Sequence, residues 1–146
     1  MRARGPYGDQ NRALMTAFKK WADKEGLMQK QTSIYGIARD NPDTVDPQDC
    51  RYDCCIPVTD EFIIKNKNII NGDKKTEDVH SAFLEGGKYA VFEIDHTAEA
   101  LQEAWNVIFD KLKEKNLTYD TSRPILERYR EEIVAVHACE LCVPIL

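Results

Sequence analysis

Residues 53–58, Asp-Cys-Cys-Ile-Pro-Val, and residues 140–145, Glu-Leu-Cys-Val-Pro-Ile, share one pattern at a shift of 87 positions. The same shift superimposes two stretches with helical spacing: Ala13, Leu14, Ala17, Phe18 and Trp21 fall on Ala100, Leu101, Ala104, Trp105 and Ile108. One register that fits both a helix and a distant strand predicts an internal duplication. The segments near Tyr35 and near Leu126 fit this register less well and need a small compensating gap.

Local patterns give each repeat one helix and several strands. Apolar residues at helical spacing predict helices over 11–25 and 97–115, the second with Thr97 as its N-cap. Alternating and apolar stretches predict strands over 32–39, 51–58, 124–130 and 138–145. A hairpin is expected with strands over 79–85 and 89–96, joined by Gly86-Gly87. The shift also places a first strand at the start of the chain, equivalent to the one from Lys88 onward.

We therefore expect one α+β domain over residues 1–146, built from a duplicated strand–helix–strand–strand repeat. Repeat one covers about 1–58, a polar bridge about 59–76 and repeat two about 77–146. Two such units form one largely antiparallel sheet with the two long helices on one face. A ligand groove is expected on the other face, where neither repeat covers the sheet.

The bulk composition narrows the class of protein. Lys plus Arg number 20 and Asp plus Glu 25, which gives a net charge of −5 and argues against direct DNA binding by this chain. No apolar run is long enough to span a membrane, and the N-terminus lacks the apolar stretch of a signal peptide. The sequence predicts a soluble, cytoplasmic protein without a membrane partner, and it does not indicate an oligomeric state.

The cysteines do not form a metal or disulfide pattern. Their odd number, without an export signal, favours reduced thiols; they are Cys50, Cys54, Cys55, Cys139 and Cys142. Cys139 and Cys142 have a spacing seen in zinc sites, but on a strand they point to opposite faces. No phosphate-binding loop or other cofactor motif is present, so we expect neither a metal nor a cofactor.

An ordered set of motifs spans the chain: Gly5-Pro6-Tyr7, Tyr35-Gly36-Ile37, Arg51-Tyr52-Asp53, Gly86-Gly87-x-Tyr89, Ala104-Trp105, Pro124-x-x-Glu127-x-Tyr129 and Glu140-x-x-Val143-Pro144-Ile145. This set resembles the GyrI-like domain family, the effector-binding domain of AraC-type regulators. The resemblance implies a two-repeat fold that binds small, drug-like molecules, often lipophilic cations, in transcription regulation and multidrug sensing. The DNA-binding helices of such regulators are absent from this sequence, so a fused or separate DNA-binding regulator is an expected partner.

The resemblance assigns the acidic pocket residue to Glu127. Glu127 and Tyr129 are two apart on a predicted strand and therefore share a face. A carboxylate inside an aromatic groove is costly to leave charged and unpaired, so it binds a cation or takes up a proton. The expected aromatic walls, with Tyr35 and Tyr129 ranked first, are Tyr35, Tyr129, Trp105, Tyr7, Tyr89 and Tyr52. Arg51 and Asp53 are expected to form a structural ion pair.

Three functions remain open at this stage. The first is a binding module, either free-standing or excised from a larger regulator. The second, which the resemblance suggests, is a hydrolase of strained electrophilic antibiotics in which Glu127 is the general acid or base. The third is an interaction protein similar to the gyrase inhibitor of the family. Binding and hydrolysis use the same carboxylate, so the sequence does not separate them.

Overall fold

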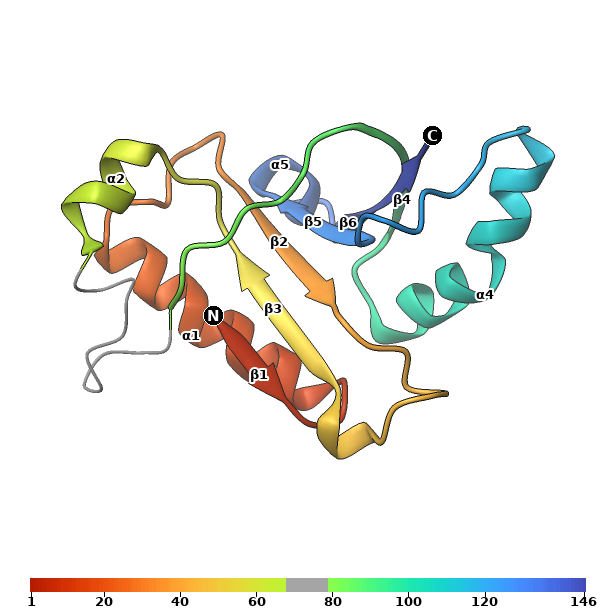
Figure 1. Ribbon diagram of the computed structural model, residues 1–146, viewed down its shortest axis with the longest axis horizontal. Coiled ribbons are helices and arrows are strands. Elements are labelled where there is room, and N and C mark those ends of the chain that lie inside the picture. The colour runs from red at the N-terminus through yellow and green to blue at the C-terminus, as the bar shows by residue number, and fades with distance from the viewer. Residues whose placement is uncertain (68–78) are drawn as a thin grey trace.

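The computed structural model describes residues 1–67 and 79–146 as an α+β fold (Figure 1). Its six strands are β1 Arg2–Arg4, β2 Ser33–Ala38, β3 Arg51–Cys55, β4 Lys88–Asp95, β5 Leu126–Arg130 and β6 Ala138–Ile145. Its helices are α1 Asp9–Lys24, α2 Asp60–Lys65, α4 Ala98–Glu114 and α5 Glu131–Val134, with a short 3-10 helix at Pro47–Asp49. The predicted α+β class with two long helices is confirmed.

The strands form one sheet in the order β1-β3-β2-β5-β6-β4, and every pairing is antiparallel. Each half of the chain contributes three strands, and β2 meets β5 at the centre. Strands with equivalent positions in the predicted repeats therefore occupy mirrored positions in the sheet. This order fits a duplication, which itself stays a prediction.

The strand register shows that both long helices lie on one face of the sheet. Gly36 of β2 pairs with Cys54 on one side and with Glu127 on the other, and Glu127 pairs with Leu141 of β6. Directly paired residues point to the same face. Cys54 belongs to the core under α1, and Leu141 to the core under α4. Figure 1 views the opposite face, with β1 and β3 in front of α1.

Each long helix has its own core. The buried residues under α1 are Phe18, Trp21, Ala22, Ile34, Tyr52, Cys54 and Val79. Those under α4 are Ala104, Ile108, Leu112, Ile125, Leu141 and Val143. Thr97 caps α4 as predicted, because its Oγ1 accepts the Ala100 N–H at 3.1 Å. Gly26 ends α1 with φ of +70°, a conformation that favours glycine.

The expected hairpin is wrong. Residues 79–87 form no strand, and among the described residues β4 pairs only with β6. Val79, which suggested a strand, is buried in the core under α1 instead, whereas Phe83 is 92% exposed. The apolar residue Val79 thus reflects burial in the core under α1 rather than strand pairing.

The polar bridge contains a helix that the sequence pattern did not predict. Thr59 caps α2 by accepting the Phe62 N–H at 3.2 Å. The rest of the bridge, over 68–76, lies outside the described residues. No helix in the described ranges is long and apolar enough to cross a membrane.

Candidate functional site

Glu127 lies on β5 at the centre of the helix-covered face. Because α1 packs over β1 and β3 and α4 packs over β4, the central strands β2 and β5 run between the two helices. The groove was expected on the opposite face, and for a site anchored by Glu127 that placement is corrected. Sequence parity shows that Glu127 and Tyr129 share a face, but which face the helices cover depends on tertiary packing.

Two tyrosine hydroxyls hold the Glu127 carboxyl from one side. The hydroxyls of Tyr52 on β3 and Tyr129 on β5 both donate to Oε2, the latter at 2.8 Å. No described residue donates to Oε1. In the described ranges the fully enclosed polar side-chain atoms without a partner are Tyr89 Oη and Arg123 Nη1, so Oε1 keeps an opening to solvent.

Gly36 provides the space for this arrangement. A Cβ at this position would overlap the Tyr52 hydroxyl and would lie 2.9 Å from Glu127 Oε2. The absent side chain therefore leaves room for the tyrosine and the carboxyl on the central strands. Sequence analysis did not assign Gly36 to the site, although an isolated glycine inside a strand is a known sign of close approach.

Burial dominates the electrostatics of Glu127, which is only 6% exposed. Burial raises the pKa of its carboxyl, and the hydrogen bonds from Tyr52 and Tyr129 offset part of that effect. Burial also raises the pKa of both tyrosine hydroxyls, so they remain donors at neutral pH. The site thus holds an acidic group under conditions that favour its neutral form.

The other buried acids differ from Glu127 because each contacts two arginines. The pairs are Arg2–Asp53 at 2.6 Å, Arg39–Asp53 at 2.7 Å, Arg128–Glu140 at 2.8 Å and Arg130–Glu140 at 2.7 Å. These contacts lower the pKa of Asp53 despite burial, and that of Glu140 to about 2. Within the described ranges, Glu127 alone among the buried acids makes no salt bridge.

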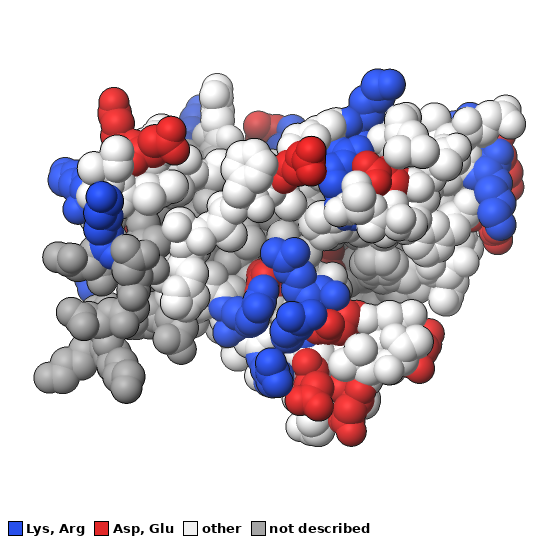
Figure 2. Space-filling view, in the orientation of Figure 1, with Lys and Arg blue, Asp and Glu red and all other residues white. Residues whose placement is uncertain are grey.

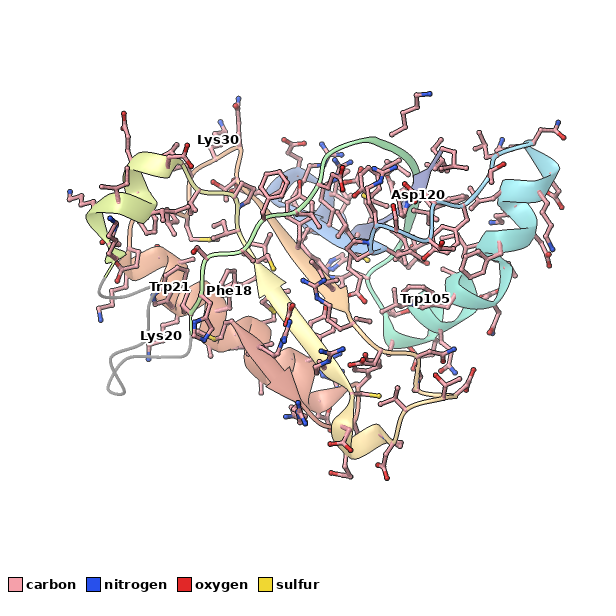
Figure 3. The ribbon with its side chains drawn as sticks, in the orientation of Figure 1. Phe18, Lys20, Trp21, Lys30, Trp105 and Asp120 are labelled. Atoms are coloured by element: carbon pink, nitrogen blue, oxygen red, sulfur yellow. The ribbon has the colours of Figure 1, made fainter. Side chains whose placement is uncertain are left out.

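Two of the expected aromatic residues, Tyr7 and Trp105, make no hydrogen bond with the Glu127 carboxyl in the described part of the chain. The Tyr7 ring packs edge-on against Tyr52 with centroids 6.2 Å apart, while its hydroxyl donates to the Asp40 carbonyl oxygen at 2.9 Å. Trp105 is partly buried at the core under α4. Figure 3 shows Trp105 on α4 and Phe18 on α1, on the two sides of the central strands.

Tyr35 and Tyr89 lie on the other face of the sheet. Tyr35 pairs with Arg128 and Tyr89 pairs with Pro144, both of which point away from the helices. The Arg123 guanidinium stacks over the Tyr89 ring at 4.9 Å. These two tyrosines therefore cannot line one site together with Glu127.

The face that carries Tyr35 holds a small apolar cluster of Ile37, Leu126 and Cys142, and it also carries charged side chains such as Arg128 and Glu140. Figure 2 shows basic side chains gathered on this face with acidic side chains beside them. The expected Arg51–Asp53 pair is wrong, because Arg51 binds Asp40 at 2.7 Å while Asp53 binds Arg2 and Arg39. A shared face allowed the Arg51–Asp53 pair, but the neighbouring strands supply better-placed partners.

His96, between β4 and α4, also adjoins the site and was not predicted. Its ring lies against the Tyr129 ring with centroids 5.2 Å apart. Burial is the main cause that lowers the pKa of His96, and the charges of Lys19 and His137 lower it further. The position before a helix carries no sequence signal that would single out this histidine.

Two surface hollows have linings that do not include Glu127. One hollow of about 370 Å³ is lined by Gly86, Gly87, Ser122 and Arg123, among others, and a second of about 340 Å³ lies between β4 and α4.

Cys139 pairs with Ile94 and Cys142 with Val91, which places the two thiols on opposite faces of β6. No group of metal-ligating side chains occurs among the described residues.

The sequence is similar to known proteins over nearly its whole length. Residues 1–146 match the GyrI-like family, described as a GyrI-like small molecule binding domain. The chain is also 38% identical over 142 residues to the "SPbeta prophage-derived putative transcriptional regulator YosT" of Bacillus subtilis (strain 168). That similarity covers 97% of this chain and 87% of the relative.

Proposed function

The chain belongs to the GyrI-like small molecule binding domain family, and from this premise we propose that it binds a lipophilic cation at Glu127 between α1 and α4. The hydroxyls of Tyr52 and Tyr129 donate to the carboxyl from one side, and under this proposal Trp105 of α4 contributes a further aromatic face. Aromatic faces favour cations by about 0.5–2 kcal/mol each when the site excludes water.

One observation carries the proposal. Glu127 is buried, and no basic side chain among the described residues compensates it, although Asp53 and Glu140 each have two arginines. An uncompensated buried acid is costly and is more common at functional sites than in structural cores. A ligand cation supplies the missing partner.

We extend the proposal to transcription regulation. The similarity to the B. subtilis relative covers nearly the whole of both chains, so the part that would sense a ligand is shared. Under this proposal a DNA-binding partner responds to the ligand-bound state of the domain.

Calorimetry with matched ligands tests the binding proposal. The probes are naphthylmethyl-dimethylammonium and the neutral methoxymethylnaphthalene, which has a similar shape. In Glu127→Gln, the cation should lose about 1.5–3 kcal/mol, or about 10- to 150-fold in affinity, because a charge-assisted contact is removed. The neutral probe should lose much less. Glu103→Gln, which removes an exposed carboxylate on α4, is the matched control. Equal cation affinity in parent and Glu127→Gln would refute the assignment.

Hydrolysis of a strained electrophile is a second candidate, and it is favoured by the Oε1 atom, to which no described residue donates. A buried carboxyl with a raised pKa can donate a proton to a leaving group as a general acid. Mass spectrometry of an electrophilic ligand after incubation separates the two functions. Addition of water that disappears in Glu127→Gln supports the enzyme, and an unchanged ligand supports binding alone.

A further inference from the structure

The hydrogen bonds around Glu127 are unequal. Both tyrosine hydroxyls donate to Oε2, and no described residue donates to Oε1. In a carboxylate the two oxygens share the charge, so donors are expected on both. In a neutral carboxylic acid, the carbonyl oxygen accepts two hydrogen bonds through its two lone pairs, and the other oxygen carries the proton.

Among the described residues, the titratable groups that act on Glu127 or on which Glu127 acts carry no positive charge. They are Tyr52 and Cys54 from β3, Tyr129 from β5 and Cys139 from β6. Burial raises the pKa of Cys54 to about 12 and that of Cys139 to about 11, so both thiols stay neutral. From the helix side, Lys19 of α1 acts on His96, whose ring lies beyond Tyr129.

We propose that Glu127 is a neutral carboxylic acid in the ligand-free domain, that its proton lies on Oε1, and that a bound cation replaces this proton. The inference rests on the proposed function, because the cation is the ligand proposed above. On binding, the O–H bond at Oε1 breaks, the proton leaves to solvent and the ligand cation takes its place beside the carboxylate. No other bond changes.

This exchange defines the chemical class of the ligand. The proton occupied a position from which Oε1 accepts a hydrogen bond once it is charged. A cation with an N–H, such as a protonated tertiary amine, donates to Oε1, whereas a quaternary ammonium ion has no hydrogen to donate. The protonated amine therefore binds about tenfold or more tightly than a quaternary ion of the same shape.

Infrared spectroscopy tests the first half of the proposal without any ligand. At neutral pH, the difference spectrum between the parent and Glu127→Gln should contain the carbonyl band of a neutral carboxylic acid. The same band should be retained in the control Glu103→Gln, whose lost carboxylate is exposed. A difference spectrum with carboxylate bands only would overturn the proposal, whatever the domain binds.

Calorimetry tests the second half. Naphthylmethyl-dimethylammonium and naphthylmethyl-trimethylammonium are titrated in phosphate and in Tris at the same pH, and the buffer dependence of the enthalpy counts protons. We expect about one proton released per bound cation in the parent and none in Glu127→Gln. A buffer-independent enthalpy, or equal affinity for the two probes, contradicts the exchange. If the infrared band is present and neither cation binds, the proposed function fails instead.

Discussion

Gly36 and Glu127 are cross-strand neighbours at the centre of the sheet, and their contrast in size explains how the carboxyl is buried. The tyrosine hydroxyl of β3 reaches across Gly36 to Oε2, over a space that any side chain would fill. In a site of this kind, a glycine on one strand leaves the space in which the acid of the neighbouring strand is buried.

Gly36→Ala should therefore destabilise the domain. The new Cβ would meet the Tyr52 hydroxyl and the Glu127 carboxyl, and crowding a packed core costs about 1–3 kcal/mol. Urea unfolding measures the change. Gly86→Ala is the control, because no atom lies within 4 Å of its added Cβ. Tyr52→Phe removes the closest atom, so Gly36→Ala should cost less in that background. An equal cost in both backgrounds would show that the hydroxyl is not the obstacle.

Part of the site could be predicted from the sequence alone. Glu127, Tyr129 and Tyr52 were predicted, and the structure brings their side chains together. Tyr35 was ranked equally with Tyr129, yet it points to the opposite face. Alternation fixes which residues of one strand share a face, but the relation between separate strands depends on register, which only the folded sheet defines.

At the scale of elements, the same kind of ion-pair cluster occurs in each half of the sheet, on the face opposite the long helices. A buried acid in β3 and another in β6 each accept from two arginines of neighbouring segments. The acids are Asp53 and Glu140, which are 87 positions apart. Asp53 thus joins β3 to Arg2 of β1 and to Arg39 after β2, and Glu140 joins β6 to β5.

Glu140→Gln should weaken the second half of the sheet. Removing one partner of a buried ion pair costs about 3–5 kcal/mol, but the Arg128 and Arg130 side chains are 28% and 33% exposed and can regain water. We expect a loss below that range, about 2–3 kcal/mol, measured by urea unfolding. Glu132→Gln is the control, since Glu132 is mostly exposed and contacts only Arg130. A loss as small as in this control would mean that the buried cluster contributes no more than a surface pair.

Helix capping gives a second prediction at this scale. Thr97→Ala removes the side-chain acceptor at the start of α4 and should cost about 1 kcal/mol. Thr59→Ala removes the equivalent acceptor from α2, which has no buried residues, and should cost less. Thermal unfolding of both variants compares them. An equal loss would indicate that the short helix is as strongly coupled to the fold as the long one.

Helices and strands were predicted well where the residue pattern within the segment determines its structure. The bounds of β6 match the predicted strand, and α1 and α4 agree within two residues. The errors lie where a segment is defined by contacts outside itself, as in the Val79 anchor and the capped turn of α2. The predicted bridge region is polar, so a short amphipathic turn carried too few apolar residues to be recognised.

At the scale of the whole molecule, two cores lie under the long helices, and a third, smaller apolar cluster lies on the opposite face of the central strands. The core under α1 and the core under α4 are separate clusters, and Glu127 lies on the strand that connects them. Under the function proposed above, a ligand would reach Glu127 between these two clusters.

The ion-paired acids and Glu127 should make the stability of the protein depend on pH in opposite directions. Contacts with arginine lower the pKa of Glu140 and that of Asp40 to about 2, and hydrogen bonds from Ser122 and Arg123 lower the pKa of Asp120 to about 2. Their contribution is present above the unfolded pKa and is lost as the pH falls toward 2. Glu127 has the reverse sign, because its pKa is raised in the folded state.

The Glu127 contribution is fully present below the unfolded pKa of about 4.3 and is lost as the pH rises through the folded value. In that window the free energy of unfolding should fall by up to about 1.4 kcal/mol per pH unit from this group alone. Glu127→Gln cannot titrate and should lack this slope, so the variant gains on the parent as the pH rises. Urea unfolding of both proteins at several values between pH 5 and 8 measures the difference. Parallel curves across that range would mean that Glu127 is ionised in the folded domain, and the site would then need a different source of compensating charge.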